Sequence, residues 1–415
     1  MTKLRCELTS DGKHAILRGQ PSPEQQRALV GEKKKGPWRV PQDHPLARQL
    51  LPAEIRKLLD REPLPYTDDN PGGVSDELWQ KLYPFQKRTV SSVVKRYHGR
   101  CLMAHDMGLG KTVQAIALMQ HYGSPVLVLC PAFLKKNWAV EIEKWGGANI
   151  DATVVSYDSL ATSPPPFAMW SLVVADEAHW IKQKDARRTR AALPIILGGE
   201  HAVLMTGTPC PNRPEELFTL MHALRPSIVS TFAQFATRYC NARKTRFSNF
   251  DTTGSCRRPE LSWLLRRAFM LRCTKADVLS QLPPKACSPV HIKSSRTLVL
   301  NRIAELYEKM EGASPIAIKA LVSEAFRQTC TAKIDSAVAF AVAQAAKMPT
   351  VAFAHHRNML DALESAGESA RLRTVRIDGD TRLSRRHEVV QSIQEGRVDL
   401  ACLSMGAAGV GLTMT

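Results

Sequence analysis

The chain has 415 residues, with 57 lysines and arginines against 39 aspartates and glutamates, and a formal net charge of +18. Its 44% hydrophobic and 23% charged residues support folded cores and exclude a disordered polyelectrolyte. The positive excess favours a polyanionic partner, because each phosphate neutralised by lysine or arginine releases counterions. A protein that is merely basic is the alternative.

The cysteines and the hydropathy exclude two further classes. Ten cysteines are scattered between Cys6 and Cys402 with no C-x-x-C pair, which disfavours a disulfide framework or a zinc ribbon and predicts free thiols. No apolar stretch reaches the roughly 18 to 20 residues that span a bilayer, and Met1–Lys13 has no apolar signal region. We therefore expect an intracellular protein with no membrane partner.

Residues 1–74 differ in character from the rest of the chain. They contain several prolines, a lysine run at Lys33–Lys35 and one helical pattern, from Leu46 to Leu59. The segment from Pro63 to Gly73 is then typical of a linker. We predict an irregular accessory extension over residues 1–74.

From Ser75 onward, short apolar runs alternate with longer amphipathic segments. Such runs are typical of parallel strands that helices cover on both faces, and turn residues with a helix-length segment follow each one. The pattern predicts an α/β fold whose functional residues lie at the carboxyl ends of the strands. The runs are Val126–Leu129, Leu172–Ala175, Ala202–Met205, Thr350–Ala354 and Leu400–Leu403.

A glycine-rich loop follows the apolar run Arg100–Ala104 and precedes a helical pattern over Val113–Gln120. Glycines let backbone N–H groups face phosphate oxygens at the start of a helix. We therefore expect Lys111 to reach the β- and γ-phosphates of a nucleotide and Thr112 to ligate Mg²⁺. His105 stands where the strict pattern has its first glycine, and a chance helix start is the alternative. The loop consists of Asp106, Met107, Gly108, Leu109, Gly110, Lys111 and Thr112.

Two adjacent carboxylates, Asp176 and Glu177, follow the apolar run Leu172–Ala175. In such a pair, one acid can hold Mg²⁺ through its water shell while the other orients the attacking water. Asp176 is thus the second magnesium candidate, and Lys111, Asp176 and Glu177 are the catalytic candidates. A solvated strand end is the alternative, and His179 suits either a role in the site or a structural hydrogen bond.

Two weaker signals accompany these motifs. Thr206, Gly207 and Thr208 close another apolar run, and hydroxyl residues there can sense the γ-phosphate and pass its state to a neighbouring lobe. In isolation they form only a turn. Gln86 carries the paired donor and acceptor that can read an adenine edge, or it simply begins a helix.

Together and in this order, the motifs resemble those of the superfamily-two nucleic-acid translocases, and more narrowly the SWI/SNF-type ATPases. The narrower likeness rests on Asp106–Thr112, Met270–Val278 and Leu282–Lys285. Within that family the chain looks like the annealing-helicase subgroup, the HepA-related and SMARCA-like branch. That likeness lies in Tyr239–Ala242, Asp277–Leu282, Phe353–His356 and Ile377–Thr381.

The resemblance implies two RecA-like lobes of the P-loop NTPase kind, over residues 75–285 and 286–415, with parallel sheets covered by helices. It implies ATP and Mg²⁺ as cofactors and duplex or forked DNA as the partner. We also expect a monomer in the nucleus, with replication or repair proteins as possible further partners.

The resemblance also implies roles for single residues. Gln86 would contact adenine, the loop from Gly108 to Thr112 would hold the phosphates, and Asp176 and Glu177 would serve magnesium and water. Several positions match family motifs that touch DNA or couple it to the nucleotide. These are Cys130–Pro131, Thr206–Pro209, Ser404, Gly409, Gly411, Leu412 and Thr413. Arg386 matches a family arginine that follows the Asp378–Gly379 turn.

A basic cluster lies between Asn241 and Lys275, where nine lysines and arginines face two carboxylates, a net charge of +7. Such a patch can track a phosphate backbone, with Arg257 and Arg258 as the DNA-contact candidates. A solvated helix face is the alternative. For the aromatic residues interleaved in the cluster, packing in the core is the favoured interpretation.

The sequence stops at Thr415, directly after the motif from Gly409 to Thr413. In the family a further motif follows that supplies arginine fingers, which are worth about 10³ to 10⁵ in the rate of phosphoryl transfer. We therefore expect an incomplete second lobe, and a fragment that binds ATP–Mg²⁺ and hydrolyses it poorly.

These observations predict an ATP-dependent DNA translocase that remodels or reanneals DNA. A strand-separating DEAH-type helicase or RNA-dependent ATPase is one alternative, which Met270–Val278 and Leu282–Lys285 disfavour. For this chain, an ATP-binding DNA-binding module with little turnover is another.

Overall fold

In a computed structural model, the chain forms two compact units, Met1–Leu282 and Pro283–Thr415. The structure describes residues 5–19, 21–22, 25, 29, 37–61, 65–147, 150–166, 169–243, 250–278, 287–291 and 297–408. The predicted boundary between residues 285 and 286 lies outside these ranges. Residues 1–74 belong to the first compact unit. The domain boundary that the sequence predicts between residues 74 and 75 stays a prediction.

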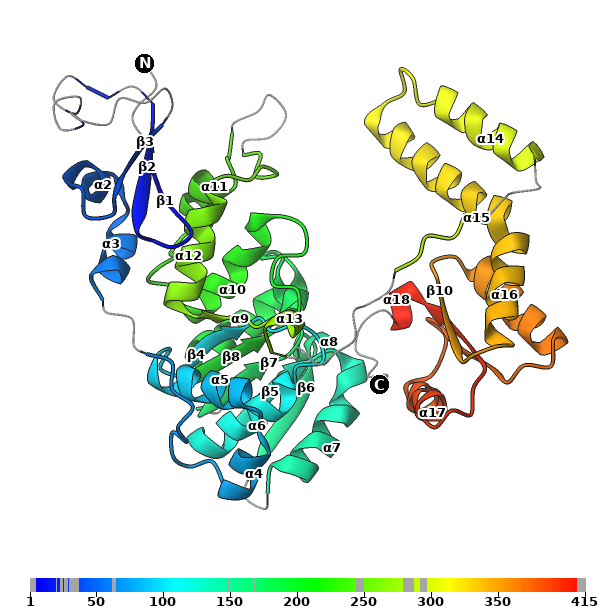
Figure 1. The fold of residues 1–415 in the computed structure, drawn as a ribbon, viewed down its shortest axis with the longest axis horizontal. Helices are drawn as coiled ribbons and strands as arrows, with labels where there is room; N and C mark the ends of the chain where they lie inside the picture. Colours follow the sequence, from blue (N-terminus) through cyan, green and yellow to red (C-terminus); the bar gives the residue numbers. More distant parts are fainter. Residues whose placement is uncertain are drawn as a thin grey trace. The chain divides into compact units, whose positions relative to one another are not determined.

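The first unit is built on a six-stranded sheet with the strand order β6-β5-β7-β8-β4-β9, in which all neighbours are parallel. Every residue of β5 and β7 is buried, because helices lie on both sides of this sheet (Figure 1). The apolar runs predicted to form strands in this unit are thus confirmed. The strands are β4 (Arg100–Met103), β5 (Val126–Cys130), β6 (Ala152–Ser156), β7 (Leu172–Ala175), β8 (His201–Met205) and β9 (Met270–Leu271).

Helical segments precede and connect these strands, as the alternation of apolar runs and amphipathic segments predicted. They are α4 (Asp76–Lys81), α5 (Pro84–Lys95), α6 (Lys111–Tyr122), η1 (Ala132–Leu134), α7 (Lys135–Trp145), α8 (Tyr157–Leu160), η2 (Ala178–Ile181), α9 (Arg187–Gly198), η3 (Pro214–Glu216), α10 (Leu217–Leu224), α11 (Phe232–Tyr239), α12 (Arg258–Ala268) and α13 (Lys275–Val278). Since the strands are parallel, their carboxyl ends meet at one edge of the sheet.

The N-terminal segment is ordered where it is described, so the prediction of an irregular extension is wrong there. It forms an antiparallel sheet of β1 (Arg5–Leu8), β2 (His14–Arg18) and β3 (Trp38–Pro41), followed by α2 (Pro45–Leu50) and α3 (Ala53–Asp60). The single helix expected from Leu46 to Leu59 is broken because Pro52 forces Leu51 into an extended conformation, with ψ 143°.

A buried carboxylate joins this N-terminal sheet to the rest of the first unit. Glu260 of α12 is 0% exposed, and its Oε2 accepts a hydrogen bond from the backbone N–H of Leu8 at 3.1 Å. Arg238 donates to both carboxylate oxygens at 2.6 and 2.8 Å, and the Tyr239 hydroxyl donates at 3.0 Å. Figure 1 shows β1 beside α12. The accessory segment is therefore docked through a neutralised ion pair.

The second unit carries a three-stranded parallel sheet in the order β10-β12-β11. The two apolar runs predicted here are confirmed as strands β10 and β12. Among the helices described in the chain, none is both long and apolar enough to cross a membrane. The elements are α14 (Thr297–Glu308), α15 (Pro315–Ala345), β10 (Thr350–Ala354), α16 (Arg357–Ser369), β11 (Thr374–Ile377), α17 (Leu383–Gln394), β12 (Leu400–Ser404) and α18 (Met405–Ala408).

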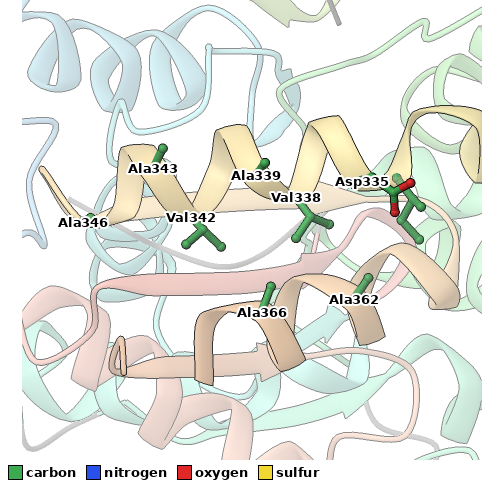
Figure 2. Close-up of a pocket in the computed structure, with 9 residues that line it drawn as sticks. Asp335, Val338, Ala339, Val342, Ala343, Ala346, Ala362 and Ala366 are labelled. Carbon is green, nitrogen blue, oxygen red and sulfur yellow. The ribbon is translucent and has the colours of Figure 1, made fainter. Parts of the chain in front are cut away.

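A groove of about 540 Å³ lies between α15 and α16 of the second unit. Figure 2 shows it lined by small apolar side chains, such as those of Val338, Val342 and Ala362, with the carboxylate of Asp335 at one end. Its lining residues include no lysine or arginine. The groove therefore has no cation for a phosphate group.

Candidate active site

The glycine-rich loop connects β4 to α6 at the carboxyl edge of the main sheet. Gly108 and Gly110 adopt positive φ values of +83° and +67°, which residues with a side chain rarely adopt. A Cβ at Gly110 would lie 2.5 Å from Nε2 of Gln86, so the backbone approaches α5 closely there. The turn ends at the start of α6, whose first N–H groups have no partner within the helix and can bind an anion. The loop geometry thus suits a phosphate group.

Lys111, the first residue of α6, folds back over this loop. Its Nζ donates to the carbonyl oxygens of His105 at 3.0 Å and Asp106 at 3.2 Å. Burial lowers the pKa of the ammonium, while the charges of Glu177 and Asp176 act in the opposite direction. The structure therefore brings the three catalytic candidates into one electrostatic site.

Asp176 is held by a tryptophan that sequence reasoning did not single out. Its carboxylate is 8% exposed, and Oδ2 accepts a hydrogen bond from the indole N–H of Trp138 on α7 at 3.0 Å. Oδ1 accepts from the backbone N–H of Glu177 at 2.8 Å. Burial, followed by the charge of Glu177, raises the pKa of Asp176 to about 6. No local motif signals this contact, because residues 138 and 176 meet only through the fold.

Glu177 begins a polar chain that leads to the turn after β8. Its Oε2 lies 3.2 Å from Nδ1 of His179, which in turn lies 3.1 Å from Oγ1 of Thr206. The same Oγ1 accepts the backbone N–H of Thr208 at 3.1 Å. His179, whose role the sequence left open, therefore bridges the carboxylate pair and the Thr206–Thr208 turn. The coupling role of that turn stays a prediction.

Gln86 touches the glycine-rich loop, but both ends of its amide already bind backbone. Its Oε1 accepts the N–H of Tyr83 at 2.9 Å, at the start of α5, and its Nε2 donates to the carbonyl of Leu109 at 3.3 Å. The side chain therefore positions the loop against α5. Its Oε1 keeps a second lone pair and its Nε2 a second N–H, and its predicted contact with adenine stays a prediction.

His105, which replaces the first glycine of the strict pattern, is a fully buried bridge. Thr89 donates its hydroxyl proton to the Phe85 carbonyl at 2.9 Å, so its oxygen accepts from Nε2–H of His105 at 3.0 Å. Nδ1 of His105 accepts the N–H of Cys273 at 3.0 Å. These bonds define a neutral imidazole. Burial, with Lys111 nearby, lowers its pKa to about 4.

The segment after β9 also contacts the loop, a contact that the family motif at Met270–Val278 did not itself predict. Asp106 accepts hydrogen bonds from Nη2 of Arg272 at 3.3 Å and from the N–H of Lys275 at 3.1 Å. The Lys275 ammonium lies 3.6 Å from where a Cβ of Gly108 would be. Lys275 thus adds a cation beside the glycine turn.

The other residues predicted to bind the nucleotide differ in their exposure to solvent. Thr112 is the second residue of α6 and is half-buried, while Leu109 is buried and Met107 is 59% exposed. A Cβ on Gly207 would lie 2.9 Å from Cγ of Met107, so the turn after β8 touches the loop. The ligand contacts predicted for these residues stay predictions.

The predicted DNA-contact residues belong to both units. Arg257 donates to the carbonyl of Arg238 at 2.7 Å, whereas Arg258 is exposed and donates to Oγ of Ser255 at 2.8 Å. In the second unit, Ser404 ends β12. The remaining predicted positions, Gly409, Gly411 and Thr413, lie outside the described residues.

Two further motif positions are visible in the structure. Cys130 is the buried last residue of β5, and Pro131 precedes η1. In the second unit, Arg386 donates to the carbonyls of Thr381 at 3.0 Å and Asp378 at 2.9 Å, so it stabilises the turn after β11. The DNA-linked role that the resemblance gave to Cys130 and Pro131 stays a prediction.

Comparison with known proteins decides the family. A family model described as the SNF2-related domain matches residues 85–163 and 160–299, just over half of the chain. The chain belongs to the SNF2-related family. The match includes the glycine-rich loop, the carboxylate pair and the segment after β9. The resemblance to SWI/SNF-type ATPases inferred from the motifs is confirmed.

Two curated relatives indicate which subgroup of the family the chain resembles. The DNA annealing helicase and endonuclease ZRANB3 of Bos taurus is 35% identical over 380 residues, covering 82% of this chain and 35% of that protein. The SWI/SNF-related matrix-associated actin-dependent regulator of chromatin subfamily A-like protein 1 of Xenopus tropicalis is 31% identical over 403 residues, covering 90% of this chain and 42% of that protein. Both relatives confirm the predicted subgroup. The chain therefore spans less than half the length of each.

Among solved structures, the SWI2/SNF2 ATPase core of Sulfolobus solfataricus in complex with dsDNA matches with a TM-score of 0.43 at 18% identity, covering 83% of this chain and 80% of that one.

Proposed function

We propose that the chain is an ATP-dependent DNA translocase of the SWI/SNF type, which uses ATP hydrolysis to remodel or reanneal DNA. The observation that carries this proposal is the meeting of three strand ends at one edge of the first sheet. The glycine-rich loop with Lys111 follows β4, the carboxylates Asp176 and Glu177 follow β7, and Thr206 follows β8. Membership of the SNF2-related family supports it.

ATP and Mg²⁺ fit the residues at this edge. The loop offers backbone N–H groups to phosphates at a turn too close to α5 for a side chain at Gly110. Thr112 and Asp176 would hold Mg²⁺, which when bound neutralises charge on the phosphates. Lys111 would add a second positive charge, and Glu177 would orient and deprotonate the attacking water.

DNA is the proposed partner, as duplex or forked substrate. The net charge of +18 supports a polyanion, and one relative is by name a DNA annealing helicase while another is a regulator of chromatin. We also propose a nuclear monomer that works with replication or repair proteins. Immunofluorescence of a tagged chain tests the location.

ATP turnover with and without DNA tests the proposed activity. We expect duplex DNA to stimulate the wild-type rate, and Lys111→Ala or Glu177→Gln to lower kcat by about 10²- to 10⁴-fold, since each removes a group that acts on the reacting phosphate or water. Glu143→Gln, an exposed carboxylate on α7, is the matched control. A rate that ignores DNA, or a Glu177→Gln rate equal to that of the control, would refute the proposal.

Assays of strand release, strand reannealing, DNA affinity and ATP turnover separate the proposal from its alternatives. A strand-separating helicase would release a labelled strand from a partial duplex, whereas a reannealing translocase would close a protein-coated bubble. A passive ATP-binding module would show the same DNA affinity for wild type and Lys111→Ala at every ATP concentration. Turnover of about 1 s⁻¹ or more would also exclude the passive module.

A further inference from the structure

A second polar pocket, of about 340 Å³, lies in the first unit where the N-terminal segment meets α12. Its walls come from the β1–β2 turn, the residue after β3, the end of α3, the segment between α3 and α4, the end of α5, and α12. The lining residues include Asp11, Gly12, Lys13, Arg61, Tyr66, Arg96, Trp263, Arg266 and Arg267. The pocket is thus rich in cations and aromatic rings.

The positive charge of this pocket is concentrated. Five lysines and arginines line it against one carboxylate among the lining residues, that of Asp11, which already accepts hydrogen bonds from the Thr9 hydroxyl and the Lys13 N–H. The pKa of the Arg267 guanidinium is lowered by burial and then by the like charges of Arg96 and Arg61. These cations repel one another, so an anion placed among them would be stabilised.

The pocket is separate from the nucleotide site. Arg96 follows the last residue of α5, while Gln86 stands near its start, about 15 Å away along the helix axis. Arg266 and Arg267 come before β9, whereas Arg272 and Lys275, which contact the glycine-rich loop, come after it. The pocket therefore lies at the amino ends of the strands, on the opposite edge of the sheet.

The N-terminal segment completes this pocket by direct contact. A Cβ on Gly12, at φ +72°, would lie 2.0 Å from Nε1 of Trp263, so the β1–β2 turn is pressed against that ring. Arg267 donates to the carbonyl of Leu58 at 3.2 Å and also to that of Arg61. Neither part alone has the full set of cations. The docking of residues 5–61 on α12 thus builds a composite site.

We propose that this composite pocket binds a phosphate group of a DNA strand, as an anchor outside the motor's nucleotide site. The proposal rests on the proposed function, which supplies DNA as the partner. Arg61 and Arg266 are exposed at the pocket, where a continuous backbone can reach them. The Tyr66 ring is 56% exposed and lies 4.7 Å from the Arg96 guanidinium, so a base beside the bound phosphate can stack there.

Salt-dependent DNA binding tests the anchor. Arg61→Gln and Arg266→Gln remove guanidinium groups that make no side-chain hydrogen bond or ion pair within the described residues, so both variants should fold. Fluorescence anisotropy with a labelled duplex, from 0.05 to 0.3 M salt, should show the slope of log affinity against log salt reduced by about 0.9 for each arginine–phosphate pair that a substitution removes. Affinity at 0.1 M salt should fall about eightfold for each such pair. Arg56→Gln, an exposed arginine of α3, is the matched control.

Other results would contradict the anchor, the translocase proposal or both. If both variants bind DNA as Arg56→Gln does, the anchor is refuted while the translocase proposal stands. If the wild type binds no DNA, both fail. In a second arm, sodium pyrophosphate is titrated against each protein. If the variants lose affinity for pyrophosphate but bind the duplex as the wild type does, the pocket binds free phosphate compounds and the DNA assignment is overturned. ATP turnover without DNA should be unchanged in both variants.

Discussion

His105 shows how the first unit tolerates a departure from the nucleotide-loop pattern. The imidazole replaces a glycine, yet it has a partner at each nitrogen, Thr89 at one and the Cys273 N–H at the other. It thereby ties the loop to α5 and to the segment after β9. A buried histidine held neutral in this way makes the loop sensitive to acid, because protonation would remove the acceptor at Nδ1.

The acid sensitivity of His105 is a measurable consequence. Its folded pKa of about 4 lies below the ordinary value of 6.5, so the neutral ring contributes stability that is present above pH 6.5 and lost as pH falls toward 4. The shift corresponds to about 3 kcal/mol. Urea unfolding of His105→Gln between pH 7 and 4.5 should lack this loss. The surface variant His98→Asn should keep it, and equal pH slopes for wild type and His105→Gln would contradict the assignment.

Trp138 is expected to position Asp176. Trp138→Phe keeps the buried ring but removes the N–H that binds Oδ2, leaving a buried carboxylate with one donor fewer, a loss of about 1.5 to 3 kcal/mol for a bond to a charged group. We expect kcat for ATP to fall about tenfold with little change in KM. Trp145→Phe, whose indole binds Glu141 on the same helix, is the control. A fall in stability with unchanged kcat would show a purely structural role.

At the scale of single residues, the sequence predicts which side chains form the nucleotide site but does not predict the hydrogen bonds that hold them in place. The spacing of Lys111 and Thr112 after two glycines, and of two carboxylates after an apolar strand, was enough to place the candidate site. The bond from Trp138 to Asp176 spans 38 residues of the chain, and the bonds of His105 to Thr89 and Cys273 span 16 and 168, so no local pattern signals them. Such contacts follow from tertiary packing alone.

Among the elements, the N-terminal sheet depends on one carboxylate of α12. Glu260→Gln removes the buried charge that neutralises Arg238 and leaves that partly buried guanidinium without a counter-ion, and breaking a buried pair typically costs about 3–5 kcal/mol. The free energy of unfolding from urea titration should fall by that amount. Glu77→Gln, which breaks an exposed pair with Lys81, should cause no measurable change. Equal stabilities of the two variants would show that Glu260 does not hold the sheet.

The elements themselves were predictable where burial is uniform. Strands β5, β7 and β8 are central, so nearly every residue is apolar and the runs are visible in the sequence. Strands β6 and β11 lie at sheet edges, are only partly buried and have a mixed composition that gave no such signal, whereas the edge strand β10 is apolar enough to be visible. The helix pattern from Leu46 to Leu59 failed for a local reason, the break at Pro52. The N-terminal sheet was missed because its strands are short and the partner of β1, helix α12, lies far away along the chain.

For the molecule as a whole, buried contacts define separate cooperative units. One hydrophobic core runs from Leu8 of β1 through the main sheet to Leu271 of β9, so the N-terminal sheet and the nucleotide site share it. The cores around Leu360 and Ile377 belong entirely to the second unit. Residues that share a core tend to unfold together, whereas units with their own cores can melt independently.

Calorimetry of the full chain should therefore show two transitions. ATP–Mg²⁺ at about 100 times its Kd should stabilise the first unit by about 2.7 kcal/mol, because the described residues of the nucleotide site all belong to that unit. Lys111→Ala should abolish the shift, while Glu260→Gln should lower the same transition and leave its response to nucleotide intact. If Glu260→Gln splits off a third transition, the N-terminal sheet is a separate cooperative unit. A single transition for the wild type would instead mean that the two units unfold as one.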